Sequence, residues 1–166
     1  MQCVIRAEWR LASTRPLNNQ LILGIDDPKV CLINVGEEEG KGNLLAQATY
    51  PLLQKNKNIN FTGNIEGRDV LVNKADVMLC DGFTGNIILK MAESLYEICQ
   101  KKKLVDEYFA RFNFENYGGT PVLGVAKPVI IGHGISHAKA FMNMIHLAQI
   151  MLEKNLMQKM KEKLQS

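Results

Sequence analysis

The residues best suited to chemistry lie in short glycine-containing segments, of which Asp81 to Asn86 (DGFTGN) carries the strongest signal. Thr84 and Asn86 offer side-chain donors, and Gly82 and Gly85 offer backbone N–H groups. Lys90 adds an ammonium group one turn into the helical pattern that follows. Donors gathered at a helix start are typical of a phosphate-binding loop. A capped helix start, in which the glycines serve only a tight turn, explains the same residues equally well.

A second segment, Gly63 to Asp69 (GNIEGRD), contains the one arginine of these glycine-rich segments. The planar guanidinium group of Arg68 suits bidentate binding of a phosphate group. The alternative is an exposed ion pair of Arg68 with Asp69 or Glu66, which is the commoner outcome for an isolated loop. Both interpretations stay open on the sequence alone.

A third segment, His133 to Ser136 (HGIS), places an imidazole and a hydroxyl group near a predicted helix start. His133 is suited to donate to a developing oxyanion or to act as an acid or base, and a histidine bonded to backbone groups is the alternative. His137 follows, but no H-E-x-x-H pattern accompanies the pair, so we predict no zinc site. The adjacent carboxylates at 37–39 do not point one way, so we expect no metal there. We expect no cofactor either.

Four short apolar runs are predicted to be the strands that position these segments: 30–34, 59–62, 77–80 and 129–131. The runs at 30–34 and 77–80 are too short for helices and are followed by glycine-bearing polar segments, as is typical of buried parallel strands. The run at 59–62 alternates weakly, and the run at 129–131 follows Pro128. Strands that alternate with helical patterns indicate an α/β fold with a parallel sheet. Because the carboxyl ends of parallel strands lie at one edge, we expect the segments to meet at one crevice that binds an anion.

Three helical patterns follow these strands. The first, within residues 36–56, contains Pro51, so we expect a kink or an early stop. The second is an amphipathic helix whose apolar face carries Ile87, Met91, Leu95 and Ile98. The third, residues 138–164, is predicted to be one long helix in which helical spacing relates Phe141, Ile145, Ala148 and Leu152.

Residues 101–127 depart from this alternation, because three lysines are followed by an aromatic-rich stretch. We interpret about 101–116 as a helical excursion that covers the sheet. One alternative is a dimer face. Another is an amphipathic helix that lies on an anionic membrane or on an acidic protein.

Composition excludes several classes of protein. With 166 residues, 46% hydrophobic and 22% charged, the chain matches a globular domain and neither a disordered nor a collagen-like sequence. Its 20 basic and 17 acidic residues give a net charge of +3, so we expect no nucleic-acid partner. No apolar stretch is long enough to span a membrane. Four dispersed cysteines, and Glu8 and Trp9 near the start, favour a reduced cytoplasmic location over secretion.

Five strings in this order resemble the PlsX family of phosphate acyltransferases: LINVGEEEGKGN, INFTGNIEGRD, ADVMLCDGFTGNIILK, YGGTPVLG and KPVIIGHGISHAKA. The resemblance runs from about Leu23 to Ala148, yet it covers only about the C-terminal half of a family member. It implies a three-layer α/β/α fold with a mainly parallel sheet, similar to phosphotransacetylases and to isocitrate and isopropylmalate dehydrogenases, truncated at the N-terminus. We therefore expect an atypical segment over 1–22 and part of a single domain over 23–166.

The resemblance implies that an acyl group passes from acyl carrier protein to inorganic phosphate, giving acyl-phosphate for phospholipid synthesis. Phosphate is already a nucleophile, so positioning and oxyanion stabilisation should dominate. His133 is then the oxyanion donor or leaving-group acid, and Lys90 gives electrostatic support. The expected phosphate ligands are Asn64, Arg68, Gly82, Thr84, Gly85, Asn86 and Ser136.

The resemblance also implies a homodimer formed through the excursion. Basic residues there are expected to contact the carrier protein or the inner face of the membrane: Lys101, Lys102, Lys103 and Arg111. Two rival functions stay open, a phosphotransacetylase that uses acyl-CoA and a non-catalytic remnant that lacks half of the crevice. Activity with coenzyme A thioesters tests the first, and phosphate-dependent thermal stabilisation counts against the second.

Overall fold

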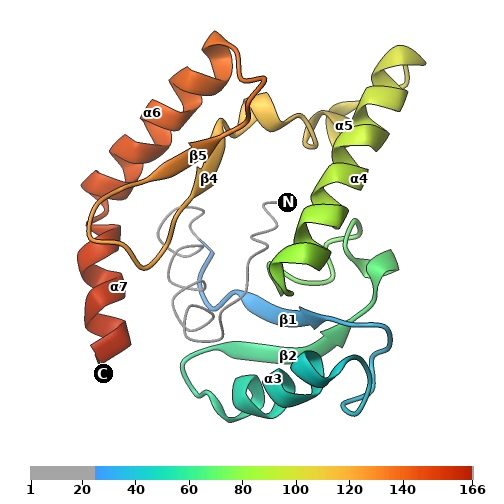
Figure 1. Cartoon of the computed structure of the whole chain (residues 1–166), viewed down its shortest axis with the longest axis vertical. Helices are drawn as coiled ribbons and strands as arrows, with labels where there is room; N and C mark the ends of the chain where they lie inside the picture. The colour runs from blue at the N-terminus through green and yellow to red at the C-terminus, as the bar shows by residue number, and fades with distance from the viewer. Residues whose placement is uncertain (1–24, 166) are drawn as a thin grey trace. The chain divides into compact units, whose positions relative to one another are not determined.

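The computed structural model describes residues 25–165, which form two compact units (Figure 1). Unit 1 holds the residues up to Gly85 together with those from Glu162 on, and unit 2 runs from Asn86 to Lys161. The boundary falls within helix α4 (Gly82–Lys101), which begins in unit 1 and continues in unit 2. The predicted boundary at residue 22 lies outside the described residues.

Unit 1 is built on a parallel sheet of strands in the order β2-β1-β3. Strands β1 (Lys29–Ile33), β2 (Asn60–Ile65) and β3 (Val77–Leu79) confirm three of the predicted strands, with shifted ends. Strands β1 and β3 are well hidden from solvent, since Val30, Cys31 and Leu32 of β1 and all three residues of β3 are buried. A strand covered on both faces needs apolar side chains at successive positions, which is why these runs do not alternate.

Strand β2 extends three residues beyond its predicted end because it contains a bulge. The register with β1 shifts between Val30 and Leu32, which pair with Phe61 and Asn64, so β2 carries one extra residue there. Gly63 supplies the positive φ of 103° that such an irregularity needs. After the bulge both Asn64 and Ile65 are buried, so the polar side chain of Asn64 lies beneath the surface.

Helix α3 (Leu44–Lys55) packs against β2 and supplies Leu53 to the core of unit 1. Its first turn is capped by Asn43, whose side chain accepts a hydrogen bond from the N–H of Ala46. The expected early stop at Pro51 is wrong, because the helix continues to Lys55. The buried core cluster consists of Val30, Leu32, Leu53, Val77 and Leu79.

Unit 2 contains a two-stranded antiparallel sheet, β4 (Gly119–Pro121) and β5 (Ile130–Gly132), against which helix α6 (Ala138–Glu153) packs. The predicted fourth strand is therefore present, but it pairs antiparallel with β4 and does not join the parallel sheet. Close packing depends on Gly118, where an added Cβ would lie 2.5 Å from the backbone nitrogen of Met144 in α6. The α/β class with a parallel sheet is confirmed, and the three-layer arrangement stays a prediction.

One further helical prediction needs correction. The single long helix over 138–164 is broken after Glu153, where Asn155 has a positive φ of 51°, and α7 (Leu156–Gln165) follows. The excursion over 101–116 contains only short pieces, α5 (Glu107–Ala110) and the 3₁₀ turn η2 (Phe114–Asn116). None of the helices within residues 25–165 has the length and apolar character that crossing a membrane requires.

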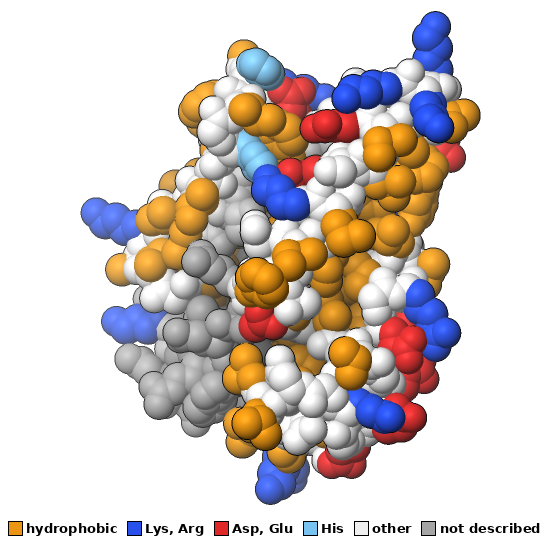
Figure 2. All heavy atoms as spheres, turned by 45° about the vertical axis from the view of Figure 1, so that its right-hand side comes forward, with side chains coloured by type: hydrophobic (Ala, Val, Ile, Leu, Met, Phe, Trp, Pro, Cys, Tyr) orange, Lys and Arg blue, Asp and Glu red, His pale blue; other side chains and the backbone are white. Residues whose placement is uncertain are grey.

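The predicted apolar faces of α4 and α6 are only partly packed. Figure 2 shows hydrophobic side chains gathered on the surface over α4. The exposed members of the two predicted faces are Ile87, Met91 and Ile98 on α4 and Phe141, Ile145 and Leu152 on α6. Unit 2 therefore leaves apolar helix surface in contact with water.

Candidate functional site

The segment after β2 presents Arg68 within the short 3₁₀ turn η1 (Gly67–Asp69). Its Nη2 lies 2.9 Å from Oε2 of Glu66, and the Arg68 side chain is 74% exposed. The turn itself is held by Asp69, whose Oδ2 accepts the N–H of Glu66 at 3.0 Å. The surface ion pair is thus the arrangement present, and it leaves most of the guanidinium group within reach of a dissolved anion.

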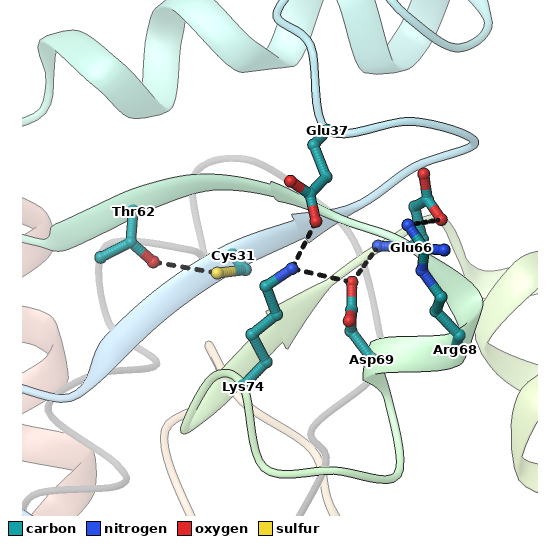
Figure 3. A network of polar contacts seen from close by, with 7 residues as sticks. All are labelled: Cys31, Glu37, Thr62, Glu66, Arg68, Asp69 and Lys74. Carbon is teal, nitrogen blue, oxygen red and sulfur yellow. Dashed lines mark hydrogen bonds and ion pairs between the residues drawn. The ribbon is translucent and has the colours of Figure 1, made fainter.

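Lys74 ties the segment after β1 to the segment after β2 (Figure 3). Its Nζ contacts the carboxylate of Glu37 and lies 3.1 Å from Oδ2 of Asp69. The hydrogen bond from the N–H of Glu66, and then the contact with Lys74, lower the pKa of Asp69 below its usual value. The hydrogen bonds to Glu37 and then to Asp69 raise the pKa of Lys74. The network links the two segments, and no sequence pattern indicated it.

Asn64 is only 6% exposed, and the nitrogen and oxygen of its side-chain amide differ in their hydrogen bonding. Its Nδ2 donates to the carbonyl oxygen of Glu38 at 2.9 Å, which fastens the segment after β1. Its Oδ1 is buried and has no hydrogen-bond partner among residues 25–165. A buried acceptor without a donor costs about 1–3 kcal/mol, so a ligand that brings an O–H or N–H group would be favoured there. Of the oxygens of inorganic phosphate, only a protonated one can serve as that donor.

The start of α4 is capped by Asp81. Its Oδ1 accepts the backbone N–H groups of Phe83 and Thr84, both at 2.9 Å, and its Oδ2 accepts the hydroxyl of Thr84 at 2.6 Å. The Thr84 hydroxyl and then the Thr84 N–H lower the pKa of Asp81, so the carboxylate is charged near neutral pH. Gly85 is buried and donates its N–H to the carbonyl oxygen of Asp81. The capped helix start is therefore what the structure contains, and the anion at this helix start is Asp81 itself.

Unit 2 brings two ionisable side chains, Lys90 and Glu93, to the imidazole of His133. Its Nε2 lies 3.1 Å from Oε1 of Glu93 and 3.3 Å from Nζ of Lys90. Lys90 also donates to Oε2 of Glu93 at 2.8 Å. The ring of Phe114 lies 4.7 Å from the imidazole, measured between ring centres, and covers one side of it. His133 is therefore bonded to side chains and not to the backbone groups considered as its alternative.

Sequence reasoning missed Glu93, the carboxylate at the centre of this cluster. A signal was present, because Glu93 follows Lys90 by three residues on a helix and such residues lie on the same face. Its partner His133 is 40 residues away in the chain, and no local sequence pattern relates two residues so far apart.

The other predicted site residues are more loosely placed. Ser136 closes a turn by donating its N–H to the carbonyl oxygen of His133, and its Oγ is buried without a partner in the described part of the chain. Gly82 and Asn86 are exposed in the first turns of α4. Among the basic residues, Lys101, Lys102 and Lys103 are exposed at the end of α4, whereas Arg111 lies 4.3 Å over the ring of Tyr108. Within residues 25–165, no three His, Cys, Asp or Glu side chains gather as metal ligands would.

Comparison with known proteins covers nearly all of these residues. A family model described as "Fatty acid synthesis protein" matches residues 17–159. A protein named phosphate acyltransferase from Aquifex aeolicus is 44% identical over 146 residues, which cover 76% of this chain and 43% of that protein. Proteins of the same name from Syntrophomonas wolfei and Dictyoglomus thermophilum are 40% and 41% identical, covering 83% and 85% of this chain and 45% and 48% of their own lengths. The chain therefore spans about half the length of these relatives.

Proposed function

Because the chain belongs to the fatty acid synthesis protein family, we propose that it supplies part of a phosphate acyltransferase that moves an acyl group from acyl carrier protein to inorganic phosphate. The observation that carries the proposal is the extent of the match, since residues 17–159 include every candidate segment of both units. Relatives of the same printed name at about 40% identity support it.

The proposed reaction needs positive charge and hydrogen-bond donors more than a strong base. An oxygen of hydrogen phosphate attacks the thioester carbonyl carbon, the C–O bond forms and the C–S bond breaks. The proton of hydrogen phosphate ends on the departing thiolate, so the products are acyl-phosphate and the free thiol. Negative charge develops on the carbonyl oxygen and then on sulfur, which favours cationic partners held in place beforehand.

Unit 1 contributes most of the phosphate ligands in this proposal, and Asn86 and Ser136 belong to unit 2. Arg68 is the main one, because its guanidinium group is exposed and is held by a single surface carboxylate that phosphate can replace. Asn64 adds a buried acceptor for the protonated phosphate oxygen. Secondary contacts are assigned to Gly82, Thr84, Gly85 and Asn86 at the start of α4, although Asp81 occupies the Thr84 hydroxyl and must release it.

Unit 2 contributes His133 as leaving-group acid or oxyanion donor and Lys90 as electrostatic support, with Ser136 as an additional phosphate contact. The short contacts of Lys90 and His133 with Glu93 support a shared role. We further propose that the exposed lysines at 101–103, with Arg111, receive the acidic carrier protein or an anionic membrane surface, and that the enzyme is a cytoplasmic, peripherally bound homodimer.

Phosphate binding is tested by thermal unfolding of the 166-residue chain with and without inorganic phosphate. A ligand that binds only the folded state must stabilise it, by about 2.7 kcal/mol at roughly 100 times its dissociation constant. We expect a concentration-dependent rise in melting temperature that is lost in Arg68→Ala and kept in Lys57→Ala, a matched loss of an exposed positive charge. No rise in the wild type would favour the non-catalytic remnant. Turnover of acyl-CoA in preference to the carrier thioester would favour a phosphotransacetylase.

A further inference from the structure

From the contacts of unit 2 we infer that Glu93 is a positioning residue for His133, which it holds in the tautomer with the proton on Nε2 so that Nδ1 is left for the substrate. The inference rests on the proposed function for the part that His133 plays in acyl transfer. The tautomer itself is a property of the folded chain and is measurable without any reaction.

The two polar neighbours of Nε2 make opposite demands on it. Glu93 is an acceptor and needs a proton on Nε2, whereas Lys90 is a donor and needs a lone pair there. A neutral ring carries one proton, so Nε2 satisfies one neighbour only. Whichever neighbour prevails sets the tautomer, because the proton then lies on Nε2 or on Nδ1.

The geometry favours Glu93. Its Oε1 is the nearer neighbour at 3.1 Å, against 3.3 Å for Lys90 Nζ. Lys90 already has a closer acceptor in Oε2 of the same carboxylate at 2.8 Å, whereas Oε1 of Glu93 has the imidazole as its donor. A lone pair on Nε2 would face the negative Oε1 without a proton between them, which is repulsive. The ring of Phe114 restricts rotation of the imidazole out of this arrangement.

Nδ1 is then the atom that is available for chemistry. It has no hydrogen-bond partner within residues 25–165, and the His133 side chain is about one-third exposed. In the protonated ring, Nδ1–H gives its proton to the thiolate as the C–S bond breaks. The ring is then neutral, and its Nε2–H still donates a hydrogen bond to Glu93. The proton that hydrogen phosphate loses on acylation restores the imidazolium, so the step balances.

The tautomer is read from the ¹⁵N chemical shifts of the two ring nitrogens of His133 in uniformly labelled protein, at a pH where the ring is neutral. Resonances are assigned with His137→Gln and His146→Gln. We expect Nε2–H in the wild type and in Lys90→Met. In Glu93→Met the Nδ1–H form should become prominent, because Lys90 is then the remaining partner of Nε2. Glu97→Met, at an exposed position one turn further along α4, serves as the matched control and should leave the wild-type tautomer.

A wild-type ring with Nδ1–H would overturn the inference, as would an unchanged tautomer in folded Glu93→Met, and the wild-type spectrum decides even if the variant does not fold. In the acyl transfer assay, Glu93→Met should lower kcat by about 10²-fold, the low end of what general acid catalysis contributes, with little change in KM for phosphate. A tautomer that shifts as expected in a chain that consumes no acyl thioester under any condition supports the positioning by Glu93 and contradicts the proposed function.

Discussion

Glu66 and phosphate compete for the guanidinium group of Arg68 in this proposal, and the competition can be measured. Removing a charged hydrogen-bond partner costs about 1.5–3 kcal/mol, so Arg68→Ala should raise KM for phosphate by roughly 10- to 100-fold. Arg68→Lys should recover only part of the loss, because lysine keeps the charge but lacks the planar fork. Glu66→Gln should lower KM by up to about fivefold, since an exposed pair contributes up to about 1 kcal/mol.

Steady-state kinetics at varied phosphate and fixed acyl thioester provides the measurement. Lys57→Ala controls for the loss of an exposed positive charge in unit 1. If KM for phosphate is the same in Arg68→Ala as in the wild type, phosphate does not bind at η1, and the assignment of Arg68 as the main phosphate ligand is wrong.

At the scale of elements, the start of α4 depends on one ionised side chain. Asp81→Ala removes the cap from two backbone N–H groups and should lower the free energy of unfolding by about 1 kcal/mol near neutral pH. The pKa of Asp81 is lowered in the folded chain, so its stabilisation is present above the ordinary aspartate pKa of about 3.9 and is lost as pH falls through the folded value.

The stability difference between wild type and Asp81→Ala should therefore shrink between pH 7 and pH 3. Urea unfolding at a series of pH values, followed by the helical signal in circular dichroism, measures it. Glu97→Ala, at an exposed position of the same helix, should show no such dependence. A difference that stays constant with pH would mean that the Asp81 carboxylate does not cap the helix as a charged group.

Elements with a uniform local pattern were predictable, and those that depend on single backbone conformations were not. The runs at Val30 and Val77 and the helix after Gly82 were recognised because burial imposes a repeating pattern. The bulge at Gly63 breaks that pattern, so the length of β2 was underestimated. The end of α6 at Glu153 depends on the positive φ of Asn155, which residue type alone does not dictate.

The candidate site was predictable as segments but not as contacts. Arg68, Lys90 and His133 were singled out from their types and their places after predicted strands. Their partners depend on pairs far apart in the chain, such as Glu37 with Lys74 and Glu93 with His133, which only the tertiary structure relates.

At the scale of the whole molecule, the chain spans about half the length of its relatives, and unit 2 leaves apolar residues of α4 and α6 exposed. Exposed apolar helix faces are typical of surfaces that associate with further protein. We therefore expect the acyl transfer activity of this chain to be highest in the presence of a polypeptide that corresponds to the N-terminal half of a relative.

The most direct test of the proposed function is the phosphate-dependent consumption of acyl-carrier thioester, with acyl-phosphate quantified as the product. The purified chain is assayed alone and with a separately expressed N-terminal half of a relative, alongside His133→Ala in both settings. We predict acyl-phosphate formation that requires phosphate, is greatest with both polypeptides and is strongly reduced in His133→Ala. Thioester that remains intact in both settings, or is consumed equally well by His133→Ala, would contradict the assignment of this chain as the acyl transfer part of a phosphate acyltransferase.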